Sequence, residues 1–183
     1  MRIGIYVGSF NPVHVGHIHV VNYLLENDYV DKVLFIPTPS YWDKTNLADM
    51  NDRINMLKVY ESDKIIVDTT HNNHPYTYQV LNSLRSDYKD DEFYLIIGSD
   101  NIEKFHLWEH VDEILKNKVI IVKRDDTDIE KYTNKFNTNN FIIVKDFKPI
   151  EISSTEIRNN IESKYLDKEV YNYIKENNLY WEW

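Results

Sequence analysis

The sequence predicts an α/β fold, in which a doubly wound parallel sheet of about six strands carries helices on both faces. Short, continuous apolar runs recur along the 183 residues, and such runs are typical of strands that are buried on both sides. Stretches with helical spacing separate most of these runs, which is the order found in βα units. Two short motifs also follow predicted strands directly, at the edge of the sheet where such folds bind ligands.

The strands are predicted from apolar runs that end at turn-forming or polar residues. Pro37 and Pro39 follow the second run, and Gly98 ends the fourth. The predicted strands cover residues 3–7, 33–36, 65–67, 93–97, 119–122 and 141–144.

The helices are predicted from apolar residues that recur at helical spacing, such as Ile18, Val21 and Leu25 in the first of them. The predicted helices cover residues 17–25, 54–60, 78–84, 111–115 and 168–177, and one more begins near residue 153. Residues 39–46 are expected to form a loop, and the charged stretch 125–140 a mobile or helical surface segment. No linker or repeat divides the chain, so we expect a single domain over residues 1–183.

Composition excludes several classes of protein. The chain has no cysteine, so disulfides, thiolate metal sites and cysteine nucleophiles are absent. A formal net charge of −9 disfavours non-specific nucleic-acid binding, which needs a basic face. No apolar run approaches the roughly 20 residues that span a bilayer, and no signal peptide is seen, so we expect a cytoplasmic protein without a membrane partner. The sequence is compatible with a homo-oligomer but does not set the oligomeric state.

The first motif, GSFNPVHVGH, occupies residues 8–17 after the first predicted strand. Gly8 is expected to take a backbone conformation closed to other residues and to let a ligand approach the main chain. The start of the following helix favours a negative group. His14 and His17 are three residues apart, so they can share one side of the first turn and donate to phosphate oxygens in a transition state.

The spacing of these histidines is compatible with two other interpretations. They can be ordinary polar residues at a helix start, which is the usual meaning of an isolated His-x-x-His. A zinc site with His19 is also conceivable, but no glutamate completes an H-E-x-x-H pattern and no third ligand is evident, so no metal site is predicted.

The second motif, ISSTEIR, occupies residues 152–158. Ser153 and Glu156 fit a capping box at the start of a helix, which is a structural explanation in itself. The same arrangement leaves the hydroxyl and N–H groups of Ser154 and Thr155 at a positive helix end. Arg158 follows within a turn, and its planar guanidinium suits phosphate oxygens.

The remaining histidines are expected to have no special role. His71 and His74 fall in an Asn-rich loop, and a surface or packing role is favoured over a metal site for the pair His106 and His110.

The first motif resembles the His-x-Gly-His signature of the nucleotidyltransferase superfamily, and the second motif resembles that superfamily's second signature. Class I aminoacyl-tRNA synthetases share the first, but this chain is too short to be one. Between the motifs, residues 75–81 (PYTYQVL), 96–101 (IIGSDN) and 105–108 (FHLW) resemble segments of the nicotinate or nicotinamide mononucleotide adenylyltransferase family. The resemblance covers nearly the whole chain.

This resemblance implies a Rossmann-like sheet and a reaction that joins a pyridine mononucleotide to the AMP part of ATP, with magnesium carried on the ATP phosphates. His14, His17 and Arg158 would be catalytic. The implied ATP-binding residues are Gly8, Ser9, Phe10, His14, His17, Asp100, Arg124, Ser154, Thr155 and Arg158. The implied mononucleotide-binding residues are Lys44, Thr77 and Trp108, with Trp108 stacking on the pyridine ring.

The chain departs from the family pattern in two places. Residues 39–44 read PSYWDK where the family often has Pro-Pro-His-Lys, and Val80 replaces a second threonine. The leading hypothesis is an adenylyltransferase that acts on nicotinate mononucleotide in NAD synthesis. These departures leave nicotinamide mononucleotide open as the alternative substrate. Phosphopantetheine adenylyltransferase, an alcohol-phosphate cytidylyltransferase and a catalytically silent nucleotide sensor are the alternatives.

Overall fold

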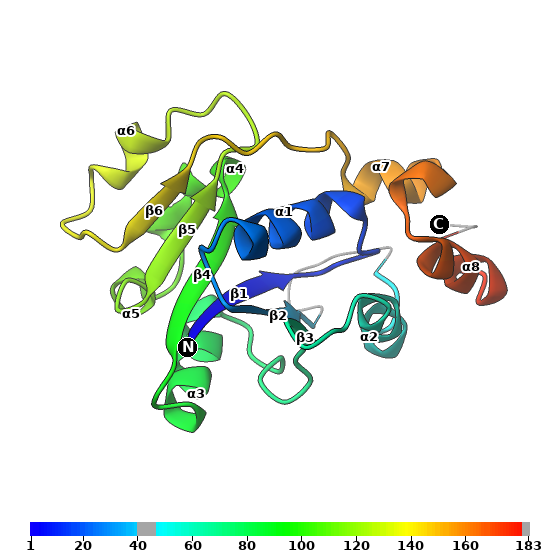
Figure 1. Cartoon of the computed structure of the whole chain (residues 1–183), viewed down its shortest axis with the longest axis horizontal. Helices are drawn as coiled ribbons and strands as arrows, with labels where there is room; N and C mark the ends of the chain where they lie inside the picture. The colour runs from blue at the N-terminus through cyan, green and yellow to red at the C-terminus, as the bar shows by residue number, and fades with distance from the viewer. Residues whose placement is uncertain (40–46, 181–183) are drawn as a thin grey trace.

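A computed structural model describes residues 1–39 and 47–180 and places all six predicted strands in one parallel sheet. The strand order is β3-β2-β1-β4-β5-β6, as Figure 1 shows. The strands are β1 (Arg2–Gly8), β2 (Lys32–Pro37), β3 (Ile65–Val67), β4 (Glu92–Gly98), β5 (Lys118–Val122) and β6 (Phe141–Val144). The predicted α/β, doubly wound, Rossmann-like sheet is therefore confirmed.

Helices connect the strands, and most lie where the sequence predicts them. They are α1 (Val15–Glu26), α2 (Met50–Lys58), α3 (Thr77–Asp87), α4 (Ser99–Ile102), α5 (Val111–Ile114), α6 (Ile129–Thr133), α7 (Ser154–Asn159) and α8 (Lys168–Glu176). Two 3₁₀ turns cover Phe105–Leu107 and Ser163–Tyr165. The short α4 and both 3₁₀ turns were not predicted.

The sheet separates two apolar cores, because side chains alternate between the faces of each strand. On one face Tyr6 packs with buried residues of α1, α2 and α8. On the other face Ile5 packs with buried residues of α3, α5 and α6. Figure 1 shows α1 crossing the first of these faces, with α7 beside the beginning of α1.

The strand order reverses between β1 and β4. From β1 the chain proceeds outward to β2 and β3, and it later returns to β4 on the other side of β1. The loops after β1 and β4 therefore turn toward opposite faces and leave a crevice at the carboxyl edge, which is where open α/β sheets bind ligands. Within the part of the chain that the structure describes, no helix is long and apolar enough to cross a membrane.

Candidate active site

The first motif forms the start of α1, which His14 and His17 cap together. His14 is the N-cap of α1, and its Nδ1 accepts a hydrogen bond from the Gly16 N–H at 3.0 Å. The His17 Nδ1 accepts one from the His14 N–H at 3.1 Å. Their rings stack, with centroids 3.7 Å apart. The helix begins at Val15, two residues earlier than predicted. The expectation that His14 and His17 share one side of the first turn is confirmed.

Two glycines shape this turn, but not both as predicted. A Cβ on Gly16 would lie 2.8 Å from the His14 ring, so only glycine lets the ring cross the helix start. Gly8 does not adopt the left-handed conformation that we expected, since no glycine in the described residues has a positive φ. Phe10 takes that conformation instead, with φ of 47°. A Cβ on Gly8 would lie 3.2 Å from the Phe10 ring, a tight contact that the ring would relieve by moving a few tenths of an ångström.

The surroundings of the histidine pair keep both rings neutral. Burial lowers the pKa of His14 to about 4, with a smaller contribution from the positive charge of Arg124. Burial, then His14, then Arg124 lower the pKa of His17 well below its usual value. Because each Nδ1 accepts a hydrogen bond, each neutral ring carries its proton on Nε2. The pair therefore offers two Nε2–H donors to an anionic ligand.

The second motif lies against the first, although the two are more than 140 residues apart in sequence. The Ser154 hydroxyl donates to the Pro12 carbonyl at 2.9 Å, and the Arg158 guanidinium donates to the Asn11 carbonyl at 2.8 Å. Arg158 also donates to the Thr155 hydroxyl at 3.3 Å. The structure thus brings the residues of both motifs to one corner of the sheet.

Of the capping box predicted for α7, the structure shows the N-cap hydrogen bond. The Ser153 hydroxyl accepts from the Glu156 N–H at 3.1 Å, as expected for an N-cap. The Glu156 carboxylate receives the Ser153 hydroxyl at 3.4 Å. This cap places Ser154 at the first position of the helix.

A buried network that sequence reasoning missed holds the loop of the first motif. The Asn11 side-chain oxygen accepts from the Tyr180 hydroxyl at 2.7 Å and from the Ala48 N–H at 3.1 Å. Arg53 is only 2% exposed and donates to the carbonyls of Ser9, Thr38 and Ala48 at 2.8–2.9 Å. Carbonyls of the loops after β1 and β2 are therefore fixed by one guanidinium.

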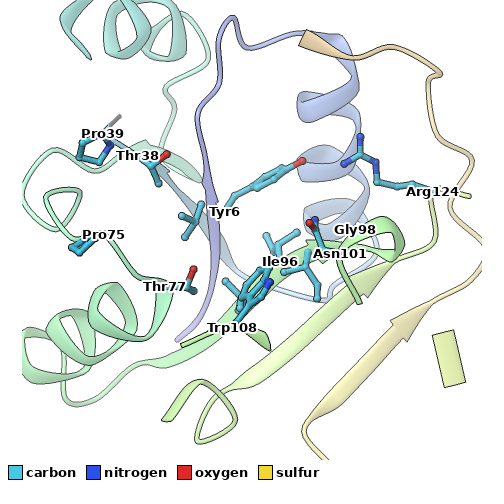
Figure 2. A pocket seen from close by; sticks show the side chains of 13 residues that line it. Tyr6, Thr38, Pro39, Pro75, Thr77, Ile96, Gly98, Asn101, Trp108 and Arg124 are labelled. Carbon is cyan, nitrogen blue, oxygen red and sulfur yellow. The ribbon is translucent and has the colours of Figure 1, made fainter. Parts of the chain in front are cut away.

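A cavity of about 500 Å³ opens at the crevice between β1 and β4. Figure 2 shows Trp108 and Thr77 near one end and Arg124 at the other, with the Tyr6 ring reaching toward the guanidinium. The lining residues are Tyr6, Val7, Thr38, Pro39, Pro75, Thr77, Leu95, Ile96, Ile97, Gly98, Asn101, Trp108 and Arg124. The volume falls in the range of small-molecule sites.

The loops after β4 and β5 meet at one edge of this cavity. The buried Ser99 hydroxyl accepts from the Arg124 N–H at 2.8 Å and donates to the Asp125 carboxylate at 2.8 Å. A Cβ on Gly98 would lie 2.3 Å from an Asp100 carboxylate oxygen and 2.8 Å from the Arg124 side chain. Because Gly98 has no Cβ, the side chains of Asp100 and Arg124 can approach its backbone closely and lie side by side.

The two residues expected to meet a mononucleotide both line the cavity. Thr77 is the first residue of α3, and Trp108 follows the 3₁₀ turn with its ring half-buried against Phe105. Trp108 and Thr77 also border a second, adjoining hollow of about 340 Å³. Lys44 lies outside the described residues.

The other histidines divide into ordinary and unexpected cases. The His19 Nε2 contacts the Lys148 carbonyl at 2.8 Å, so His19 is already engaged away from the first motif. His106 and His110 do not share a helix, because His106 lies in the 3₁₀ turn and His110 has a left-handed backbone before α5. His71 is buried in an ionic cluster rather than placed in an open loop, which corrects our expectation.

The chain is similar to several known proteins. The family model described as cytidylyltransferase-like matches residues 5–160. A relative in Fusobacterium nucleatum, named a probable nicotinate-nucleotide adenylyltransferase, is 37% identical over 174 residues, which cover 90% of this chain and 89% of that protein. A relative of the same name in Azobacteroides pseudotrichonymphae is 39% identical over 168 residues, covering 88% and 87%.

Solved structures show the same fold. Nicotinic acid mononucleotide adenylyltransferase of Plasmodium falciparum, complexed with NaAD, superposes with a TM-score of 0.79 at 24% identity. The match covers 98% of this chain and 97% of that one.

Proposed function

Because the chain belongs to the cytidylyltransferase-like family, within its nicotinate-nucleotide adenylyltransferases, we propose that it makes a dinucleotide for NAD synthesis. It joins nicotinate mononucleotide to the AMP part of ATP and releases pyrophosphate. The observation that carries this proposal is the stacked, neutral pair of His14 and His17 at the start of α1, with Arg158 hydrogen-bonded to the same loop.

The reaction needs position and charge stabilisation more than a protein nucleophile. A phosphate oxygen of the mononucleotide attacks the α-phosphorus of ATP, and the bond from that phosphorus to the bridging oxygen breaks as pyrophosphate leaves. Negative charge builds on the phosphate oxygens in this step. The Nε2–H groups of His14 and His17 donate to that charge, and neutral donors held in place need no reorganisation as it develops.

Positively charged side chains hold the triphosphate. The Arg158 guanidinium, from α7, donates a hydrogen bond to the loop of the first motif. Arg124 is near enough to lower the pKa values of both histidines. Ser154 and Thr155 add hydroxyls at the start of α7. Gly8, Ser9 and Phe10 border the nucleotide on the β1 side, and Asp100 lies beside Arg124 on the β4 side.

The mononucleotide occupies the cavity end that contains Thr77 and Trp108. The indole ring of Trp108 offers a flat face to a pyridinium cation, an interaction of roughly 0.5–2 kcal/mol. The start of the eleven-residue helix α3 lies at Thr77, and the N–H groups of a helix start favour a carboxylate over a neutral amide. This feature supports nicotinate over nicotinamide mononucleotide. We assign Lys44 to the same substrate from the sequence alone.

Magnesium fits this donor set as a companion of ATP. His14, His17, Ser154 and Arg158 are donors to anionic oxygens, and the described residues contain no cluster of three or more His, Cys, Asp or Glu side chains that could hold a metal. Phosphate oxygens and water would hold the ion, as Mg²⁺ prefers. When bound, Mg²⁺ neutralises phosphate charge.

The partners proposed are therefore ATP and a pyridine mononucleotide. Nucleic acid and membrane are not proposed partners. A single domain and a cytoplasmic location stay predictions, and a homo-oligomer stays open.

The test is pyrophosphate release from ATP and Mg²⁺ with nicotinate mononucleotide, nicotinamide mononucleotide or phosphopantetheine supplied separately. We expect release with nicotinate mononucleotide at a kcat/KM well above that with the amide. Release only with phosphopantetheine would assign the chain to that rival reaction. ATP binding without release for any acceptor would favour a nucleotide sensor.

A further inference from the structure

A buried ionic cluster ties the end of β3 to the end of α3. The His71 imidazole lies between two carboxylates, with Nδ1 2.8 Å from an oxygen of Asp68 and Nε2 2.6 Å from an oxygen of Asp87. The side chains of His71 and Asp68 are 7% and 8% exposed, whereas that of Asp87 is 61% exposed. We call Asp68, His71 and Asp87 the clasp.

One end of the clasp is rigidly attached to the sheet. The Asp68 N–H donates to the Phe35 carbonyl at 2.9 Å, which extends the β2–β3 pairing by one residue. The second Asp68 oxygen accepts from the N–H groups of Thr70 and His71 at 3.0 and 2.7 Å. The Thr70 hydroxyl also lies 2.9 Å from the His71 Nδ1. A local turn therefore aims the imidazole at Asp87.

The segment that follows His71 in the chain lines part of the cavity. Pro75 and Thr77 line the cavity, and they follow His71 by four and six residues. The other end of α3, at Asp87, is the clasp's third member. The clasp thus spans the loop that carries the mononucleotide side of the site.

We propose that His71 is a positioning residue for the mononucleotide, which it serves by holding the loop before α3 so that Pro75 and Thr77 face the cavity. This inference rests on the proposed function for its substrate. His71 touches no reacting atom, so it is not a catalytic residue.

The chemistry of the clasp makes this role sensitive to pH. Burial lowers the pKa of His71, but the hydrogen bonds with Asp87 and Asp68 outweigh burial and leave the pKa raised. Those two carboxylates, from the loop after β3 and the end of α3, are the charged groups that act on the ring. A neutral ring has one N–H and one lone pair, so it cannot donate to both carboxylates. Deprotonation therefore frees the exposed Asp87 first.

The kinetic test measures the KM for nicotinate mononucleotide and the KM for ATP between pH 6 and 9. We expect Asp87→Asn to raise the mononucleotide KM about 3- to 10-fold at pH 6, because solvent weakens the hydrogen bond that is lost at the exposed Asp87, and to raise the ATP KM less than 2-fold. The ratio of variant to parent KM should fall toward one at high pH, where the parent has itself lost the link. Taking the ratio cancels the effect of substrate phosphate titration on KM, which is the same for both proteins. The exposed Asp90→Asn, three residues away, is the matched control.

A second measurement does not depend on turnover. In NMR spectra of the unliganded protein, the His71 ring and the Thr77 amide should titrate with one common midpoint above the ordinary histidine value of about 6.5. In Asp87→Asn that midpoint should fall. A Thr77 amide that ignores the His71 titration, or equal changes in both KM values, would overturn the proposal. A parent protein with no turnover for any mononucleotide would instead refute the proposed function, and the NMR result would still decide the positioning role.

Discussion

Histidines lie in both halves of the proposed site, and their environments shift their pKa values in opposite directions. On the ATP side, burial and nearby positive charge lower the pKa values of His14 and His17. On the mononucleotide side, two carboxylates outweigh burial and raise the pKa of His71. The pKa of a histidine here follows from its neighbours, and so does its task.

The two halves also differ in how they are held. On the ATP side, the loop of the first motif is held by the neutral histidine rings, by the Tyr180–Asn11 contact and by the guanidinium groups of Arg53 and Arg158 that donate to its carbonyls. An ionic clasp fixes the loop on the mononucleotide side. The ATP side should therefore lose stability in acid, and the mononucleotide side in base.

The largest effect expected is on turnover, in His17→Ala. Removing one donor to developing charge should lower kcat by about 10²–10³, while the Kd for ATP changes little. His19→Ala, two residues away and engaged with the Lys148 carbonyl, is the control and should keep its kcat. Equal losses of ATP binding and turnover would assign His17 to binding alone.

The second prediction concerns acid stability. The pKa of His14 is about 4 in the folded protein against about 6.5 unfolded, so its neutral form contributes stability fully above pH 6.5. That contribution, about 3 kcal/mol, is lost as the pH falls from 6.5 toward 4. His14→Asn keeps an N-cap side chain and should flatten the pH dependence of the unfolding free energy over that range. The exposed His106→Asn should leave it unchanged.

The third prediction is that His71 changes the stability with pH in the direction opposite to His14. His71 has a raised pKa in the folded protein, so its contribution is complete below about pH 6.5 and is lost as the pH rises through the raised value. Urea unfolding of Asp87→Asn should show weaker alkaline loss of stability than the parent. If the free energy of unfolding of the parent protein does not change with pH in the alkaline range, the clasp does not contribute to stability.

A smaller effect is expected for Trp108→Ala. The mononucleotide Kd should rise about 2- to 30-fold, since a cation–π contact is worth roughly 0.5–2 kcal/mol, and the Kd for ATP should hold. Calorimetric titration of each ligand makes this measurement. The neighbouring, exposed Leu107→Ala is the control. An unchanged mononucleotide Kd would make Trp108 a packing residue.

The smallest effect is expected for Tyr180→Phe, which removes only the hydroxyl that donates to Asn11. The free energy of unfolding should fall by about 1 kcal/mol, and kcat should fall by a factor of a few because Asn11 also holds Arg158. Tyr171→Phe, on the half-buried face of α8, is the control. A stable variant with normal kcat would show that the C-terminal contact does not order the first motif.

Sequence patterns predicted the sheet and each of the two motifs because these depend on neighbouring residues. Strands follow from local apolar runs, and the histidine pair follows from a spacing of three residues in one helical turn. The contacts of Tyr180 with Asn11 and of Asp87 with His71 join residues that are 169 and 16 positions apart, so no local pattern reveals them. No local pattern marks Arg53, and only the tertiary structure shows that it is buried.

The division of the site between two substrates is tested most directly by a crystal structure with nicotinate adenine dinucleotide bound. We expect the pyridine ring to lie against Trp108 and near Thr77, with phosphate oxygens within hydrogen-bond distance of the Nε2 atoms of His14 and His17. A pyridine ring bound elsewhere, or histidine Nε2 atoms turned away from the phosphates, would contradict it.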